Sequence, residues 1–396
     1  MKRNWLSYMC MAALLTGTLT SCDESSFLNL SDPNHFTESN FWKDKADAES
    51  ALAAAYSPIK GAMYGYFGAF DGWLNLNGRG DDIYTIKGEE VPMWNIANFL
   101  NSPSTGNDPY GALYSGIQRA NIVLRYIDQI PASGITEDDR SMIKGEALFL
   151  RGYQYFLLVN NYREVPLRLL PSNEDETNKG PASEAALWAQ VEDDLGNAIK
   201  CNLPVERTTA KERVTKGAAI AMLGKVYATQ HKYPEAKQLL ETLLTSPYSY
   251  ELIDDFGKNF TNEEEFNKES VYEIAYSPDG EYSWSNESGI CLGCYIPQFI
   301  GPVKSGGWAK LMPNSLLVGE FTKEPRPGVA DTKFDKRMYA SLFFVAANYG
   351  DKVPNEKWYG NNYSMDDLWE GNEGKMAGGA PSFNVSGTAG KFLIKK

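Results

Sequence analysis

The stretch that decides the fold is Leu223-Gly224-Lys225-Val226-Tyr227, followed by Ala236, Leu240, Leu243 and Pro247. Apolar residues recur here at intervals of three and four, which predicts two amphipathic helices. The turn between them ends at Pro234, and the first turn of a helix tolerates a proline. The stretch therefore predicts a pair of helices joined by a short turn.

This pattern resembles the tetratricopeptide repeat, in which L-G-x-x-Y and a later alanine lie where the two helices of one repeat touch. The closing proline falls one residue earlier than in the family pattern. A generic helical hairpin is the alternative that the spacing leaves open.

Helical periodicity continues on the N-terminal side of this pair. The spacing of apolar residues predicts helices over 44–63, 113–127 and 186–199. Thr136-Glu-Asp-Asp139 is typical of a capped helix start. The helix that follows it, through Leu157, is apolar on so broad a face that we expect it to be largely buried.

Two charged residues, Glu146 and Arg151, lie on this apolar helix. Five residues at about 100° each place them on different sides of the helix. A buried charge requires a partner, so we expect each to meet an opposite charge or a backbone group on a neighbouring helix.

Two regions depart from the helical pattern. Residues 64–110 are rich in glycine, proline and aromatic residues, which predicts a long, ordered loop insertion. Beyond Tyr248 the same residue types recur with few helix signals, and 271–276 predicts a short strand. The expected fold is mainly α: a tetratricopeptide-like scaffold of helical pairs over 37–247, with long loop-rich insertions, a few short strands and a loop-rich, ligand-facing region over 248–396.

The N-terminus has the pattern of an export signal. Lys2 and Arg3 precede an apolar run too short to span a bilayer, and Leu19-Thr20-Ser21-Cys22 follows. This ending resembles a bacterial lipobox, which implies that residues 1–21 are a lipoprotein signal peptide and that Cys22 carries the lipid. Residues 22–36 are polar and predict a tether. A soluble secreted protein whose first cysteine is accidental is the alternative.

The charge of the chain restricts its ligands. The net charge is −13, and it becomes −15 without residues 1–21, because this segment contains only Lys2 and Arg3 as charged residues. An acidic surface repels nucleic-acid phosphates and anionic lipid heads. Neutral ligands are therefore favoured.

Metal and cofactor motifs are weak. Cys291-Leu-Gly-Cys294 has a zinc-like spacing, but the sequence has no second C-x-x-C, and its only histidines are His35 and His231. In an exported chain a local disulfide or two ordinary thiols is the simpler interpretation. Phosphate-loop and dinucleotide fingerprints are also absent from the sequence. We expect no metal and no cofactor.

Taken together, the segments resemble the SusD/RagB family of Bacteroidetes outer-membrane lipoproteins, which capture nutrients, chiefly glycans, at the cell surface. The segments that carry this resemblance are Phe27-Leu28-Asn29, Phe41-Trp42, 54–57, Ile117-Gln-Arg-Ala120-Asn121, 146–153, Val165-Pro166-Leu167, 188–204, 214–219 and Phe334-Asp335-Lys336-Arg337. The family usually continues into a further helix that is not matched before Lys396, so we expect the chain to lack the family's C-terminal helices.

The resemblance implies a receptor at the outer membrane that faces the cell exterior. Such a receptor binds a glycan or oligosaccharide, delivers it to a SusC-like TonB-dependent transporter and breaks no bond. A helical-repeat scaffold that binds proteins is one alternative, because the concave faces of such repeats often hold peptides. A glycoside hydrolase is a further, less favoured one.

A neutral sugar is recognised by flat aromatic rings against its C–H face and by Asn, Asp and Arg side chains around its hydroxyls. The loops of this chain supply both kinds of residue. Trp94, Trp284 and Trp308 are favoured because their neighbours are small or polar, and packing in the core is the alternative for each ring. The predicted ligand contacts are Trp73, Asp81, Trp94, Asn95, Asn98, Tyr282, Trp284, Tyr295 and Trp308.

Catalytic residues are not expected. A glycosidase needs two carboxylates about 5 to 9.5 Å apart across the sugar. The densest candidates are Asp81-Asp82, Glu89-Glu90 and Glu263-Glu264-Glu265. Adjacent side chains point in different directions, and such acidic runs are usually solvated faces.

Overall fold

The computed structural model describes residues 41–60, 77–85, 91–100, 109–174, 178–277, 293–323, 335, 337–344, 364, 384–385, 388–389 and 392–394. Helices dominate these residues, which confirms the expected mainly α fold. Predicted features at Cys22, the segments 1–36 and 64–76, and the residues Trp73, Tyr282, Trp284 and Cys291 lie outside the described residues.

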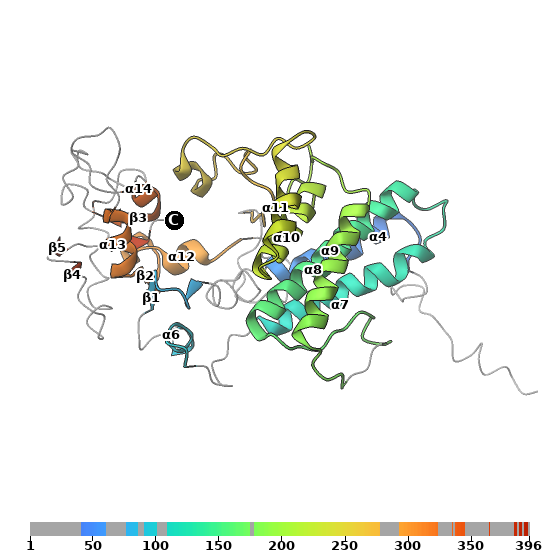
Figure 1. Cartoon of the computed structure of the whole chain (residues 1–396), viewed down its shortest axis with the longest axis horizontal. Coiled ribbons are helices and arrows are strands. Elements are labelled where there is room, and N and C mark those ends of the chain that lie inside the picture. The colour runs from blue at the N-terminus through green and yellow to red at the C-terminus, as the bar shows by residue number, and fades with distance from the viewer. Residues whose placement is uncertain are drawn as a thin grey trace, which may run out of the picture.

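The long helices form the scaffold, which lies on one side of Figure 1. They are α4 (Lys45–Lys60), α7 (Tyr110–Tyr126), α8 (Glu137–Tyr162), α9 (Glu184–Lys200), α10 (Lys216–Thr229) and α11 (Tyr233–Glu241), with the 3-10 turns η1 (Ile127–Gln129) and η2 (Thr242–Leu244). Within the described ranges, none of the helices combines the length and the apolar character that a membrane crossing requires.

Short elements gather at the opposite end of the molecule in Figure 1. The helical ones are α6 (Val91–Ala97), η3 (Phe256–Phe260), α12 (Ile296–Ile300), η5 (Val303–Ser305), α13 (Ser315–Lys323) and α14 (Arg337–Ser341). The strands are β1 (Ile83–Thr85), β2 (Leu311–Pro313), β3 (Leu342–Phe344), β4 (Asn384–Val385), β5 (Thr388–Ala389) and β6 (Phe392–Ile394). The strands pair antiparallel as β1–β2, β3–β6 and β4–β5.

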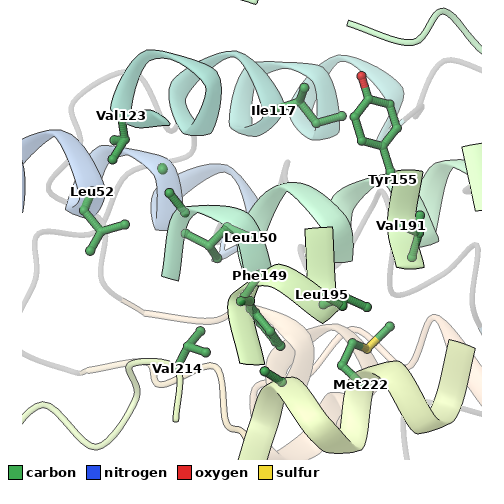
Figure 2. Packing of buried hydrophobic residues seen from close by; sticks show 14 of the residues in the cluster. Leu52, Ile117, Val123, Phe149, Leu150, Tyr155, Val191, Leu195, Val214 and Met222 are labelled. Atoms are coloured by element: carbon green, nitrogen blue, oxygen red, sulfur yellow. The ribbon is translucent and has the colours of Figure 1, made fainter. Parts of the chain in front are cut away.

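Helix α8 is the centre of the scaffold. It packs against α4, α7 and α9, so its side chains are covered on several sides. Phe149, Leu150, Tyr155 and Leu158 are at most 1% exposed. Figure 2 shows side chains of α4, α7, α9 and α10 meeting those of α8. The broad apolar face predicted from the sequence is therefore buried.

The helix starts follow local sequence signals. Thr136 accepts a hydrogen bond from the backbone N–H of Asp139 at 3.1 Å, as its capping pattern predicts. Ser183 caps α9 and Thr215 caps α10 in the same way. Pro234 lies in the first turn of α11. These side chains satisfy N–H groups that the helix itself leaves without partners.

The helix pair α10–α11 has the close contact that its sequence pattern predicts. A Cβ added to Gly224 would lie 2.5 Å from the side chain of Leu240, so a larger residue here would require Leu240 to move. Ala236 is 4% exposed at the same contact. The tetratricopeptide-like pairing is therefore confirmed in this part of the chain.

The two buried charges of α8 are paired with other elements, as expected. The Glu146 carboxylate is fully buried; it accepts hydrogen bonds from Arg207 and Arg213 at 2.7 Å and from the Tyr56 hydroxyl at 2.5 Å. Arg151 makes two hydrogen bonds to the fully buried Asp194 on α9, at 2.6 and 2.9 Å. Each charge thus joins α8 to a neighbouring segment.

The strand predicted over 271–276 is wrong. These residues are described without strand pairing, because their side chains pack on the helices instead of joining a ladder. Tyr272 and Ile274 contact the main core, and the Tyr272 ring meets Phe149 edge-on at 5.3 Å. The Tyr276 hydroxyl donates to the carbonyl of Lys60, the last residue of α4, at 3.0 Å.

Replacing Asp194 by alanine is expected to lower the free energy of unfolding by about 3 to 5 kcal/mol, because the guanidinium of Arg151 is left buried without its partner. Urea unfolding followed by circular dichroism measures the loss. The matched control is Asp193→Ala, one position along the helix and exposed, for which a change within about 0.5 kcal/mol is expected. Equal losses in the two variants would contradict this role of Asp194.

Candidate functional site

The pairing of β1 with β2 brings two of the predicted ligand clusters together. Ile83 pairs with Pro313 and Thr85 with Leu311. Beyond the paired residues, the backbone N–H of Asn314 donates to the carbonyl of Asp82 at 2.8 Å. The polar turn around Asp81 therefore lies beside the segment that follows Trp308, although the two are far apart in the sequence.

Trp308 lies in a fixed aromatic group. Its indole stacks on the ring of Tyr295, with centroids 6.2 Å apart and planes 23° apart, and meets Phe299 edge-on at 6.3 Å. Phe299 is fully buried and Tyr295 is 3% exposed, whereas Trp308 is partly exposed. Trp308 is therefore held by buried rings and keeps a surface that a ligand can reach.

The backbone around Trp308 is equally constrained. Its N–H donates to the carbonyl of Gln298 at 2.8 Å, which joins the segment to α12. The chain then turns tightly: a Cβ added to Gly307 would lie 2.1 Å from the carbonyl oxygen of Gly301. Gly306 has a φ of 92°, a left-handed conformation that glycine adopts without strain. These glycines fix the course of the backbone directly before Trp308.

Helix α6 supplies the second cluster and contacts β1. Ile96 is buried, while Trp94 and Asn95 are partly exposed and Asn98 is exposed. The amide nitrogen of Asn98 donates to the carbonyl of Trp94 at 2.7 Å, so one end of this side chain satisfies the helix terminus. The side-chain amide oxygen of Asn98 takes no part in this hydrogen bond.

We call the candidate residues Asp81, Trp94, Asn95, Asn98 and Trp308 the Trp308 surface. They lie on the turn before β1, on α6 and the residue after it, and on the segment before β2, and β1 contacts both α6 and β2. Asp81 is exposed on the turn that precedes β1. Tyr295 belongs to the same part of the fold as the buried support of Trp308, and its direct contact with a ligand stays a prediction. Trp73, Tyr282 and Trp284 lie outside the described residues.

The described carboxylates include exposed, ion-paired and fully buried groups. Glu264 forms an ion pair with Lys258, and Asp81 and Asp82 are exposed neighbours on one turn. The fully buried carboxylates Glu146 and Asp194 are held by arginine side chains and are out of reach of a substrate. Burial raises the pKa of Asp194, and its hydrogen bonds to Arg151 oppose this effect.

Metal ligands do not cluster in the part of the chain that the structure describes: no group of three or more His, Cys, Asp or Glu side chains there is placed to hold an ion. Cys294 is partly exposed, and its predicted partner Cys291 lies outside the described residues. The disulfide between them stays a prediction.

Sequence reasoning missed a hollow in the described structure, which is lined in part by Tyr248 and Tyr250. A sequence signal was present, because Pro247-Tyr248-Ser249-Tyr250 places two aromatic rings two residues apart, directly after the helical pair. The tight approach of Gly307 to Gly301 was also missed, since close backbone contacts between loops leave no periodic pattern.

The fold defines a helical-repeat protein with a second part of short elements that carries exposed aromatic and polar side chains. Family models match both parts: one described as starch-binding associating with outer membrane matches residues 81–228, and one described as SusD family matches 268–396. Together they match more than two thirds of the chain. The chain belongs to the SusD/RagB family.

Individual relatives agree with this assignment. The chain is 25% identical over 368 residues to SusD-like protein P38 of Formosa agariphila, a match that covers 85% of this chain and 69% of the relative. A SusD superfamily protein from Bacteroides vulgatus superposes with a TM-score of 0.71 at 26% identity, over 90% of this chain and 68% of that one. A laminarin-binding SusD-like protein superposes with a TM-score of 0.67 at 28% identity, over 77% and 68%.

Replacing Gly307 by alanine is expected to destabilise the segment that carries Trp308, because the new methyl group would overlap the Gly301 carbonyl. Overpacking of this kind costs about 1 to 3 kcal/mol, and thermal unfolding measures it. Gly319→Ala in α13 is the matched control, since no atom lies within 4 Å of its added Cβ. A melting temperature for Gly307→Ala that equals or exceeds that of the unchanged protein would contradict the close approach of Gly307 to Gly301.

Proposed function

We propose that this chain is a cell-surface receptor that binds a neutral oligosaccharide at the Trp308 surface and does not cleave it. The observation that carries the proposal is the partly exposed Trp308 ring, which is held by the buried rings of Tyr295 and Phe299. A pre-positioned ring stacks on a sugar with little loss of side-chain freedom. The relative that binds laminarin, at 28% identity, supports a glucan as ligand.

Family membership supports the remaining parts of this proposal. The receptor is anchored to the outer membrane through a lipid on Cys22 and faces the cell exterior. It hands its ligand to a SusC-like TonB-dependent transporter, so that binding raises the local concentration of nutrient at the transporter. Residues 22–36 act as the tether, 37–247 as the scaffold and 248–396 as the ligand-facing region.

Ligand binding at the Trp308 surface is tested with a glycan array, followed by isothermal titration calorimetry with the best-bound oligosaccharide. Trp308→Ala and Trp94→Ala are each expected to weaken binding by about tenfold or more, as the loss of a central aromatic contact does. Tyr233→Ala is the control, because Tyr233 is 60% exposed on α11, outside this surface.

The same preparations separate the competing functions. Binding without release of new reducing ends supports the receptor, whereas release of reducing ends identifies a hydrolase. Absence of binding to every glycan of the array favours a protein-binding scaffold and overturns the proposal. Full affinity in both tryptophan variants moves the site away from the Trp308 surface.

Membrane attachment is tested with Cys22→Ala. A chain without the thiol receives no lipid, and two or more acyl chains are what hold such a protein stably on a membrane. The variant is therefore expected in the soluble fraction after cell lysis, while the unmodified chain sediments with outer membranes. Ser21→Ala serves as the control because it leaves the thiol in place, and sedimentation of the Cys22 variant with membranes would exclude the lipid anchor.

A further inference from the structure

A cavity of about 300 Å³ opens where the connection between α9 and α10 meets the segment that follows η2. One wall comes from residues 205–215, which join α9 to α10, and the other from residues 247–273, which follow η2. The cavity shares no residue with the Trp308 surface. Its volume is at the small end of the range of about 300 to 1,000 Å³ for ligand pockets, so it suits a ligand of one or two rings.

The wall formed by residues 247–273 carries a stacked pair of tyrosines. The rings of Tyr248 and Tyr250 have centroids 6.1 Å apart and planes 13° apart, and both residues are partly exposed. Tyr250 fits against Gly217 in the first turn of α10, where an added Cβ would lie 2.3 Å from the Tyr250 hydroxyl oxygen. The scaffold thus places a flat, preformed aromatic face at the cavity.

The rest of the cavity is held rigidly by the core. Tyr272 contacts Phe149 of α8 edge-on. Arg207 is fixed by its ion pair with the fully buried Glu146 at 2.7 Å and by a hydrogen bond to the Val214 carbonyl at 3.1 Å. Rigid walls lower the entropy lost when a ligand binds.

The charges at the cavity nearly cancel. Arg207 is neutralised by Glu146, and Lys268 forms an ion pair with Glu251 at 3.0 Å. Glu273 accepts a hydrogen bond from the backbone N–H of Phe266 at 2.9 Å. Among the remaining lining residues, Glu206 and Lys211 are exposed and contribute one charge of each sign.

With Arg207 and Lys268 paired, the remaining charges give little selection for a charged ligand. An anion would meet Glu206 and Glu273, and a cation would meet Lys211. A neutral molecule with several hydroxyl groups meets donors and acceptors of both kinds, including the hydroxyls of Ser249 and Ser270. Its C–H face meets a tyrosine ring.

We propose that the cavity lined by Tyr248 and Tyr250, the tyrosine cavity, is a second carbohydrate-binding site that takes one or two neutral sugar units. The outer face of the tyrosine pair stacks on the sugar ring, and Glu206, Lys211, Ser249 and Ser270 bond its hydroxyls. Its geometry is independent of the Trp308 surface. Only its role rests on the proposed function. A long glycan held at the tyrosine cavity has a raised effective concentration at the Trp308 surface, so two contacts hold it better than one.

The test uses the full chain labelled with 3-fluorotyrosine and followed by fluorine NMR. Tyr248→Phe and Tyr250→Phe assign the resonances of these two tyrosines, and the exposed Tyr233 is the internal control. Glucose, mannose, galactose and N-acetylglucosamine are titrated separately, with inorganic phosphate and tetramethylammonium chloride as charged probes. A saturable shift of the Tyr248 and Tyr250 resonances with at least one neutral sugar, and none at Tyr233, is expected.

Two outcomes would overturn the tyrosine cavity as a sugar site. One is the absence of a saturable shift with all four sugars. The other is an equal response to phosphate or tetramethylammonium, which would show that neutral sugars are not selected. The readout is local to the cavity, so it is unaffected if the Trp308 surface fails to bind.

Variants provide a second measurement. Tyr248→Ala is expected to weaken the sugar-induced shift of Tyr250 by about tenfold, whereas Trp308→Ala leaves it unchanged. Gly217→Ala is expected to displace the Tyr250 ring and weaken the same response, with Gly196→Ala in α9 as its control, since its added Cβ meets no atom within 4 Å. Wild-type responses in both Tyr248→Ala and Gly217→Ala would move the sugar elsewhere.

Discussion

The Glu146 carboxylate is the constraint on which the scaffold depends. It is fully buried on the central helix α8 and is reached by Arg207 and Arg213 from the segment between α9 and α10, and by Tyr56 from α4. The Tyr56 hydroxyl also accepts the backbone N–H of Val214 at 3.0 Å. A buried charge is stable only when its partners are in place, so this one carboxylate fixes the register of three segments. It also fixes Arg207, and with it one wall of the tyrosine cavity.

The helical scaffold was predictable because its physical signals are local. Apolar spacing, the caps at Thr136 and the glycine at Gly224 each lie within one or two turns of the structure that they determine. The separate partners of Glu146 and Arg151 followed from helix geometry and from the need of a buried charge for a partner. The strand expected over 271–276 failed because Tyr272 and Ile274 pack on the helical core, and a short apolar run does not specify the partner that covers it.

The ligand-binding elements were only partly predictable. Residue types identified Trp94 and Trp308 as candidates, but their grouping depends on the pairing of β1 with β2, whose strands of three residues each carry almost no sequence signal. The support of Trp308 by the buried Tyr295 and by the Gly301–Gly307 contact is a matter of tertiary packing. The tyrosine cavity was missed although two nearby rings mark one of its walls in the sequence, because the walls meet only through tertiary packing.

The hydrogen bond from Tyr276 to the last carbonyl of α4 has a consequence for the exchange of segments among related proteins. The Lys60 ammonium also lies 5.3 Å from the centre of the Tyr276 ring, so the two positions are joined twice. Residue 60 ends a helix near the start of the chain, and residue 276 lies more than 200 positions later. A graft that carries only one of the two residues into another scaffold would lose both contacts. Recombination at either position is thus expected to preserve this junction only when Lys60 and Tyr276 are transferred together.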